Sequence, residues 1–181
     1  MPQTNTVTKT FNRPPDPIGG RASFNLEAAS NEYVYNVRVV VTQRNAASAT
    51  LVVPIRPDLA GSQRIVIGWA LAPIPGSTIS FRVDWDVVPL VQGRVILFEH
   101  VDFNGLPLVV DNASASLVAP NYNDKASSLI VLQGAWMFFK DINFQQPFMV
   151  NGAPVLLGPG TYRWVEDLGI GNDALSSLRA V

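Results

Sequence analysis

Short apolar runs separated by turn residues extend along residues 21–90. Five of these runs are rich in Val, Ile, Thr or aromatic residues, and they cover residues 22–28, 32–42, 49–55, 64–71 and 78–85. In the last run Ile79, Phe81, Val83 and Trp85 alternate with polar residues, which is the period of a half-buried strand. Five strands at this spacing predict a small β-sandwich of unknown type over residues 21–90.

The segments on either side of this predicted sandwich contain Pro and Gly. Residues 1–20 are polar and rich in both, so we expect a flexible tail there. Over residues 86–93, Pro89 and Gly93 indicate the end of a strand followed by a linker. A second domain is therefore expected from residue 93 to residue 181.

The second half of the chain is also strand-like, and it repeats itself. "RVILFEHVDFNG" at 94–105 aligns with "AWMFFKDINFQQ" at 135–146, an offset of 41 residues (94 to 135). Each copy is followed by one Asn-Asp-x-x-Ser-Ser motif, "NDKASS" at 123–128 and "NDALSS" at 172–177. No segment shows a convincing helical period. A β-unit duplicated in this way predicts two similar motifs packed face to face.

Composition and charge narrow the classes of function. Hydrophobic residues make up 48% of the 181 residues and charged residues 15%, which is enough apolar material for a packed core. The absence of cysteine excludes disulfides, thiolate zinc sites and cysteine nucleophiles. A formal net charge of −1 and the absence of a long apolar run lead us to expect neither nucleic acid nor a membrane as a partner.

Location is the least constrained property. Residues 1–20 lack the apolar segment of a secretory signal. We therefore expect a cytoplasmic protein, with the spore coat or the cell surface as alternatives.

The duplicated motif is rich in oxygen atoms. Asn and Asp favour turns and tolerate unusual backbone angles, and the motif adds an Asp carboxylate, Ser hydroxyls and free backbone carbonyls. Calcium takes six to eight such oxygen ligands. Two copies in matched repeat positions therefore indicate a shared cation site. The alternative is a pair of turns whose side chains merely cap the strands.

Residues 93–181 resemble the βγ-crystallin family, in particular its calcium-binding microbial members such as spore-coat and encystment proteins. The family's hairpin signature is an aromatic residue, four residues, a second aromatic residue, one residue and Gly; Phe98, Phe103 and Gly105 match it. Both motif copies match the family's calcium motif, Asn/Asp-Asn/Asp-x-x-Ser/Thr-Ser. "LGPGTYRW" at 157–164 is similar to the Tyr-containing turn of the family's second Greek key.

The resemblance implies two four-stranded Greek keys packed as a wedge, with two calcium ions each held by both motifs. The fifth-position hydroxyls would reach across to the ion held by the other motif, and backbone carbonyls and Asp side chains would complete each site. Asn123 and Asn172 would brace the loops. The implied ligands are Glu99, Asp124, Lys125, Ser127, Lys140, Asp173, Ala174 and Ser176.

Two departures from the family pattern affect the second hairpin. Gln146 stands where Gly is expected, and Lys140 places an ammonium group where an acidic residue is commoner. We therefore predict unequal affinities, with the site that uses the Lys140 carbonyl the weaker. With about one carboxylate per ion, the dissociation constants should be modest, roughly 10⁻⁶–10⁻⁴ M.

These observations favour a non-enzymatic, calcium-binding structural protein of the stress type. The alternative is a calcium-stabilised binding or adhesion module whose N-terminal sandwich recognises a glycan, a protein or another subunit, including a second copy of the chain. A hydrolase is disfavoured because His100 is the only histidine and no nucleophile motif is present. Asp84 and Asp86 are expected at a solvated strand edge, and Trp164 in core or corner packing.

Overall fold

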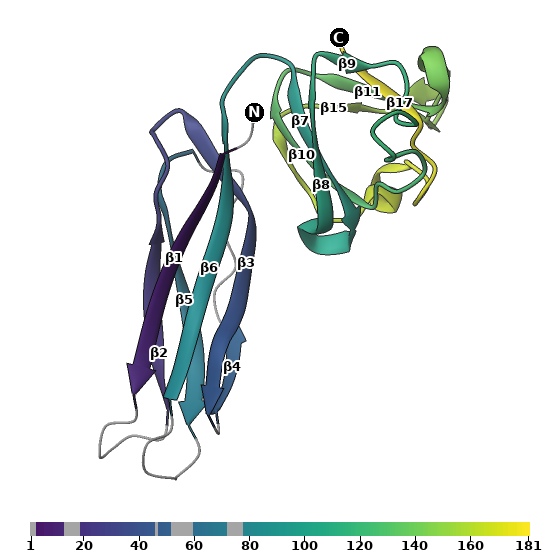
Figure 1. The fold of residues 1–181 in the computed structure, drawn as a ribbon. Helices are drawn as coiled ribbons and strands as arrows, with labels where there is room; N and C mark the ends of the chain where they lie inside the picture. Colours follow the sequence, from purple (N-terminus) through teal and green to yellow (C-terminus); the bar gives the residue numbers. More distant parts are fainter. Residues whose placement is uncertain (1–2, 13–18, 46, 52–59, 72–77) are drawn as a thin grey trace. The chain divides into compact units, whose positions relative to one another are not determined.

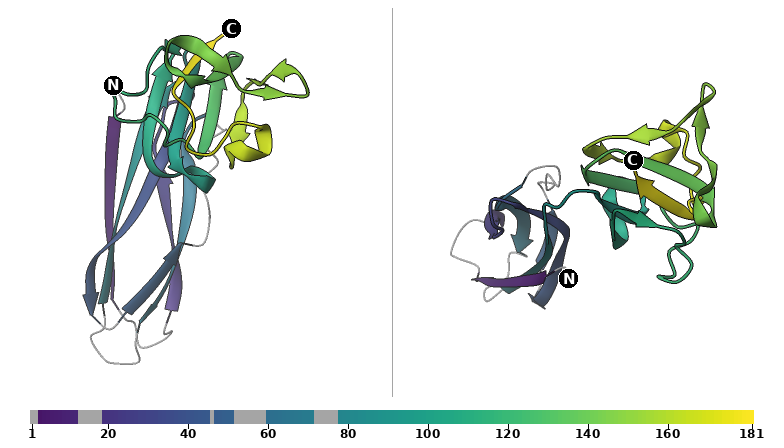
Figure 2. Two further views of the ribbon diagram at one scale, coloured as in Figure 1. Left: turned by 90° about the vertical axis from the view of Figure 1, so that its right-hand side faces the viewer. Right: turned by 90° about the horizontal axis from the view of Figure 1, so that it is seen from above.

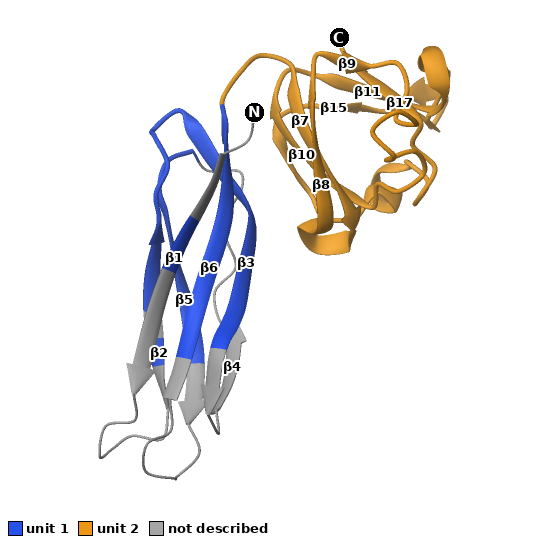
Figure 3. Cartoon of the chain, viewed as in Figure 1, with its two compact units in different colours: residues 1–89 blue, residues 90–181 orange. Residues whose placement is uncertain are grey.

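The computed structural model describes residues 3–12, 19–45, 47–51, 60–71 and 78–181 (Figure 1). The chain divides into two compact units, residues 1–89 and 90–181, which are described separately (Figure 3). Both units are built mainly from strands, so the predicted all-β fold class is confirmed. Within the described residues, no helix has the length and apolar character needed to cross a membrane.

The first unit contains two three-stranded antiparallel sheets (Figures 1 and 2). One has the order β1-β6-β3, from Gln3–Asn12, Thr78–Pro89 and Glu32–Asn45. The other has the order β2-β5-β4, from Gly19–Leu26, Gln63–Leu71 and Ala47–Leu51. Apolar side chains of both sheets form one buried cluster, which includes Phe24, Ile65, Ile67, Phe81 and Trp85. The two sheets therefore form a sandwich around a shared core.

The prediction of a flexible tail over residues 1–20 is wrong for residues 3–12, which the structure describes. Residues 3–12 form β1, which pairs with β6 in a continuous register from Gln3↔Val87 to Asn12↔Thr78. The segment "TNTVTKT" at 4–10 explains the strand, because β-branched Thr and Val favour extended backbone. Apart from Pro2, the Pro and Gly residues that suggested a tail lie at residues 14–20, and residues 13–18 lie outside the described part of the chain.

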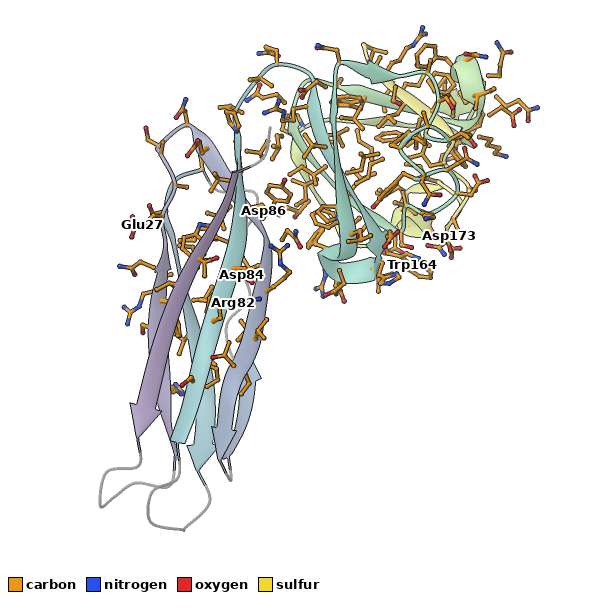
Figure 4. All side chains as sticks on the ribbon, viewed as in Figure 1. Glu27, Arg82, Asp84, Asp86, Trp164 and Asp173 are labelled. Carbon is orange, nitrogen blue, oxygen red and sulfur yellow. The ribbon has the colours of Figure 1, made fainter. Side chains whose placement is uncertain are left out.

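The prediction that Asp84 and Asp86 lie at a solvated strand edge is also wrong. Both lie on β6, the middle strand of its sheet, and they are only 8% and 7% exposed. Buried carboxylates require partners, and these are supplied by side chains at 2.6–3.5 Å. The partners are Thr6 and Arg82 for Asp84, and Asn36 and Arg38 for Asp86. Figure 4 shows Arg82, Asp84 and Asp86 on β6.

The second unit contains two sheets that exchange strands. The first has the order β16-β10-β7-β8, from Gly160–Tyr162, Ser128–Gln133, Arg94–His100 and Asn104–Asp111. The second has the order β12-β11-β17-β9, from Gln145–Pro147, Trp136–Asp141, Ser177–Ala180 and Ala113–Ser114, with β15 (Leu156–Leu157) also pairing with β11. The remaining elements are the hairpin β13–β14 (Met149–Val150, Ala153–Pro154) and the 3-10 helices η1 (Val101–Phe103), η2 (Ile142–Phe144) and η3 (Val165–Leu168).

Strand exchange makes the two repeats interdependent. β16 follows the second hairpin in sequence but joins the sheet of the first, whereas β9 follows the first hairpin and joins the sheet of the second. Each repeat is thus a Greek key that gives one strand to its neighbour. Buried residues of both repeats, among them Leu97, Leu129, Trp136 and Phe138, form one core.

The repeated hairpins have the same folded-back geometry. The rings of Phe98 and Phe103 meet edge to face at 5.7 Å, and those of Phe139 and Phe144 do so at 5.7 Å. Edge-to-face aromatic pairs of this kind contribute about 0.5–1.5 kcal/mol beyond burial of their area. The alignment at an offset of 41 residues therefore corresponds to a real structural repeat.

Gln146 adopts the positive φ that the family pattern assigns to Gly. Its φ is 50°, and φ at the equivalent Gly105 is 81°. A left-handed backbone costs a non-glycine residue about 1–2 kcal/mol, while the added freedom of Gly in the unfolded chain offsets about 0.5–1 kcal/mol. We therefore expect Gln146→Gly to raise the free energy of unfolding by about 0.5–1 kcal/mol in urea denaturation.

The matched reverse change is Gly105→Ala. It should destabilise the domain by about 2 kcal/mol, because the backbone strain is joined by a steric clash. A Cβ atom at position 105 would lie 2.9 Å from Cβ of Glu99. A stabilised Gly105→Ala protein, or a destabilised Gln146→Gly protein, would contradict this account of the turn.

Candidate metal centre

The two Asn-Asp-x-x-Ser-Ser turns contact each other in the second unit. The second residue of each turn has left-handed backbone angles, with φ of 54° at Asp124 and 50° at Asp173. The Ser127 hydroxyl donates a long hydrogen bond of 3.4 Å to Oδ1 of Asp173. The Ser176 hydroxyl does the same to Oδ1 of Asp124, at 3.3 Å. The hydroxyl of each motif therefore faces the carboxylate of the other.

The backbone fixes both serines at the ends of the repeated hairpin strands. The Ser127 amide donates to the Phe98 carbonyl at 2.9 Å, and the Ser176 amide donates to the Phe139 carbonyl at 3.0 Å. The single proton of the Ser127 hydroxyl is shared between the Glu99 carbonyl, at 2.7 Å, and the longer contact with Asp173. One hydroxyl thus contacts both the Glu99 carbonyl and the Asp173 carboxylate, which brings three of the predicted ligands together.

The first residue of each motif carries an unpaired oxygen. The amide nitrogens of Asn123 and Asn172 donate to the adjacent carboxylates, Asp124 at 2.5 Å and Asp173 at 2.9 Å, so these side chains brace the turns. Their Oδ1 atoms are buried and, within the described residues, have no hydrogen-bond partner. A buried acceptor without a partner costs about 1–3 kcal/mol. Equivalent unpaired oxygens in both turns fit a site that is completed by a cation or by water bound to it.

A pocket of about 580 Å³ lies between the two turns, beside Glu99. It is lined by five of the eight predicted ligands, namely Glu99, Asp124, Lys125, Ser127 and Asp173. His100, Val101, Trp164, Glu166 and Asn172 complete its lining. The other three predicted residues, Lys140, Ala174 and Ser176, are not part of this lining.

Trp164 and Glu166 are pocket residues that the sequence did not predict at the ion site. Core or corner packing was expected for Trp164, and its side chain is 42% exposed, so it does not lie in the core (Figure 4). By contrast, Trp136 is fully buried. Trp164 lies directly before η3 and Glu166 within it. Trp164 ends the segment "LGPGTYRW", which does not mark it as a site residue, and Glu166 lies in no motif, so only the fold places both at the pocket.

The charged side chains at the two half-sites differ. The Lys125 ammonium lies 3.8 Å from Oε1 of Glu99. Lys140, the residue equivalent to Glu99 in the second hairpin, places its ammonium 5.6 Å from the centre of the Phe148 ring. Tyr122 donates to the Leu106 carbonyl at 2.7 Å, and burial, together with the Glu99 carboxylate, raises the pKa of its hydroxyl. The pocket at Glu99 therefore holds an ion pair between Glu99 and Lys125 that the second half-site lacks.

The donor set suits a hard cation. Within the described residues, no three His, Cys, Asp or Glu side chains meet in a metal-binding group. A cation between the turns would have to use hydroxyl, amide and carbonyl oxygens with few carboxylates. Calcium accepts such ligands readily, whereas zinc and other transition metals prefer imidazole and thiolate.

Two Greek keys that exchange strands and present paired oxygen-rich turns define a class of small β-proteins. A family model described as Beta/Gamma crystallin matches residues 94–181. A relative from Ciona intestinalis, "Beta/gamma-crystallin", is 36% identical over 88 residues, which cover 49% of this chain and 98% of the relative. The chain belongs to the βγ-crystallin family, and the predicted resemblance is confirmed.

Solved structures of the family are also similar to this chain. A βγ-crystallin from Ciona intestinalis is 35% identical, with a TM-score of 0.43, and the match covers 49% of this chain and 100% of that one. A structure described as a transition-metal-ion-binding βγ-crystallin from Methanosaeta thermophila is 25% identical, with a TM-score of 0.41, and the match covers 48% of this chain and 98% of that one.

Proposed function

We propose that this protein is a non-enzymatic structural protein of the stress type, whose second unit binds and is stabilised by two calcium ions. The observation that carries the proposal is the reciprocal contact between the motifs. The Ser127 hydroxyl faces Asp173, and the Ser176 hydroxyl faces Asp124. Turns that merely capped their own strands would not need to place a hydroxyl against the carboxylate of the other turn.

Each ion would take ligands from both repeats. The Glu99 carbonyl, the Ser127 hydroxyl and the Asp173 carboxylate are already in contact, and the Ala174 carbonyl would join them. The second ion would use the Ser176 hydroxyl and the Asp124 carboxylate, together with the carbonyls of Lys125 and Lys140. The unpaired Asn oxygens lie beside these carboxylates and would accept from water bound to the ions.

Calcium would act on stability rather than on a reaction. An ion that binds the folded unit and not the unfolded chain stabilises the fold in proportion to the logarithm of its concentration above Kd. Because each proposed site uses both motifs, the ions would link the two repeats across their interface.

Isothermal titration calorimetry of the full chain tests this proposal. We expect two calcium ions per chain, with dissociation constants of roughly 10⁻⁶–10⁻⁴ M. The control is an identical titration after the addition of excess chelator, which should show no binding heat. A stoichiometry of zero in calcium-depleted protein would overturn the proposal, and a stoichiometry of one would remove one of the two sites.

The second candidate is a binding module in the first unit, for which calcium would only stabilise the adjoining domain. The adjacent Val40 and Val41 of β3 are 38% and 40% exposed. Consecutive strand residues point to opposite faces, and β3 is an edge strand of its sheet. Exposed apolar residues on an edge strand favour pairing with another chain. Sedimentation of the full chain with and without calcium tests for self-association, and a glycan array tests for sugars.

A further inference from the structure

We propose that Lys125 is a tethered counter-cation that competes with calcium and sets the affinity of the pocket at Glu99. This inference rests on the calcium-binding function proposed above. It concerns a side chain that the motif leaves free, since the third position of Asn-Asp-x-x-Ser-Ser is Lys in one copy and Ala in the other.

The charges of the pocket favour a cation. Four carboxylates line it, those of Glu99, Asp124, Glu166 and Asp173, against the one ammonium group of Lys125. Counted over the carboxylates and the ammonium alone, four negative charges and one positive charge leave these lining side chains with a formal charge of −3. Without Lys125 the same lining would carry −4. Lys125 therefore neutralises part of the field that would attract a divalent ion.

The position of the ammonium is specific. It lies 3.8 Å from Oε1 of Glu99, while Oε2 of Glu99 accepts from the Leu106 amide at 3.2 Å. The same residue supplies the carbonyl that accepts the Ser127 hydroxyl at 2.7 Å. Lys125 thus pairs with the side chain of a residue whose backbone belongs to the proposed ion site.

The other half-site lacks an ion pair equivalent to that of Lys125 and Glu99. Ala174 replaces Lys125 there, and Lys140 replaces Glu99, so no equivalent ion pair can form. The Lys140 ammonium lies over the Phe148 ring instead. The sequence points to Lys140 as the residue that weakens binding at the site that uses its own carbonyl. At the Glu99 pocket, the side chain with this effect is Lys125.

The size of the effect follows from charge repulsion near a surface. A unit charge and a divalent ion several ångströms apart repel appreciably even when the effective dielectric constant is close to that of water. Loss of the ammonium also releases the Glu99 carboxylate to attract the ion. Both changes act in the same direction, and we expect Lys125→Met to tighten calcium binding at this pocket by about 3- to 10-fold.

The test is calorimetry of the full chain for the wild type and three variants at two ionic strengths. The Lys125→Met protein should bind the ion at the Glu99 pocket about 3- to 10-fold more tightly than the wild type, and this gain should shrink in high salt. Lys125→Arg keeps the charge and should stay within about twofold of wild type. Arg94→Gln changes the net charge equally but lies at the opposite end of β7, about 16 Å along the strand, and should also stay within about twofold.

The outcomes separate this inference from the function on which it rests. If the wild type binds calcium and Lys125→Met binds no more tightly, Lys125 is not a competitor and the inference is wrong. If Arg94→Gln tightens binding as much as Lys125→Met, the effect is one of net charge, which also overturns it. If no protein in the series binds calcium, the proposed function itself fails.

Discussion

Replacing Ser177 with Ala is expected to lower the free energy of unfolding by about 1–3 kcal/mol in the absence of calcium, because two backbone groups lose the hydroxyl of a buried side chain as their partner. The Ser177 hydroxyl donates to the Asp141 carbonyl at 2.6 Å and accepts from the Phe144 amide at 3.1 Å. The residue is fully buried, so water cannot replace the lost hydroxyl without rearrangement. This one side chain fastens the folded-back turn of the second hairpin to β17.

Ser128 provides an equivalent substitution in the first repeat. Its hydroxyl donates to the His100 carbonyl at 2.6 Å and accepts from the Phe103 amide at 3.0 Å. Ser128→Ala should therefore cost a similar amount in calcium-free urea denaturation. The neighbouring Ser176→Ala is the control, because its hydroxyl makes only a long contact with Asp124. If Ser176→Ala destabilised the calcium-free protein as much as Ser177→Ala, the division of roles within the motif would be wrong.

The two adjacent serines of each motif therefore have different roles. The sixth position holds the hairpin to the sheet, while the fifth faces the opposite motif. Both are Ser in both copies, so the sequence cannot tell a structural hydroxyl from a candidate ligand by residue type. The hydrogen bonds of the folded unit separate them, since each sixth-position hydroxyl has a donor and an acceptor from its own repeat.

The fold of the second unit was readable from sequence because its signals are local and duplicated. The hairpin at Phe98 and the one at Phe139 share spacing, and each motif occupies the same place after its hairpin. The exchange of β9 and β16 between sheets has no local signal, since these strands have only two and three residues. Their pairing depends on contacts far apart in the chain, which no short pattern encodes.

The errors in the first unit also have physical causes. The Thr-rich β1 lacks large apolar residues over most of its length, so Pro and Gly nearby outweighed its β-branched residues in the sequence interpretation. Asp84 and Asp86 are buried on a middle strand, which is uncommon for carboxylates. The Arg and polar partners that make this burial tolerable come from β1, β3 and β6, and alternation within β6 alone could not show them.

The double variant Ser127→Ala, Ser176→Ala should fold and should lose its response to calcium. At a calcium concentration of about one hundred times Kd, each site should add about 2.7 kcal/mol to the stability of the wild-type unit. For a domain of this size, that gain corresponds to a rise in Tm of about 10–20 °C per site. Without the two hydroxyls each ion loses the ligand that, in the proposed arrangement, comes from the neighbouring motif.

Thermal unfolding with calcium and with chelator measures this loss directly, because the difference in Tm between the two conditions reports calcium and not the substitution. The matched control is Ser114→Ala, which removes a hydroxyl outside the motifs that donates to the Ser116 carbonyl at 3.0 Å. It should keep the full calcium-dependent rise. Each single variant should keep one intact site and about half of the wild-type rise. If the double variant retains the full rise, calcium is bound elsewhere, and the contacts between Ser127 and Asp173 and between Ser176 and Asp124 serve only to join the two turns.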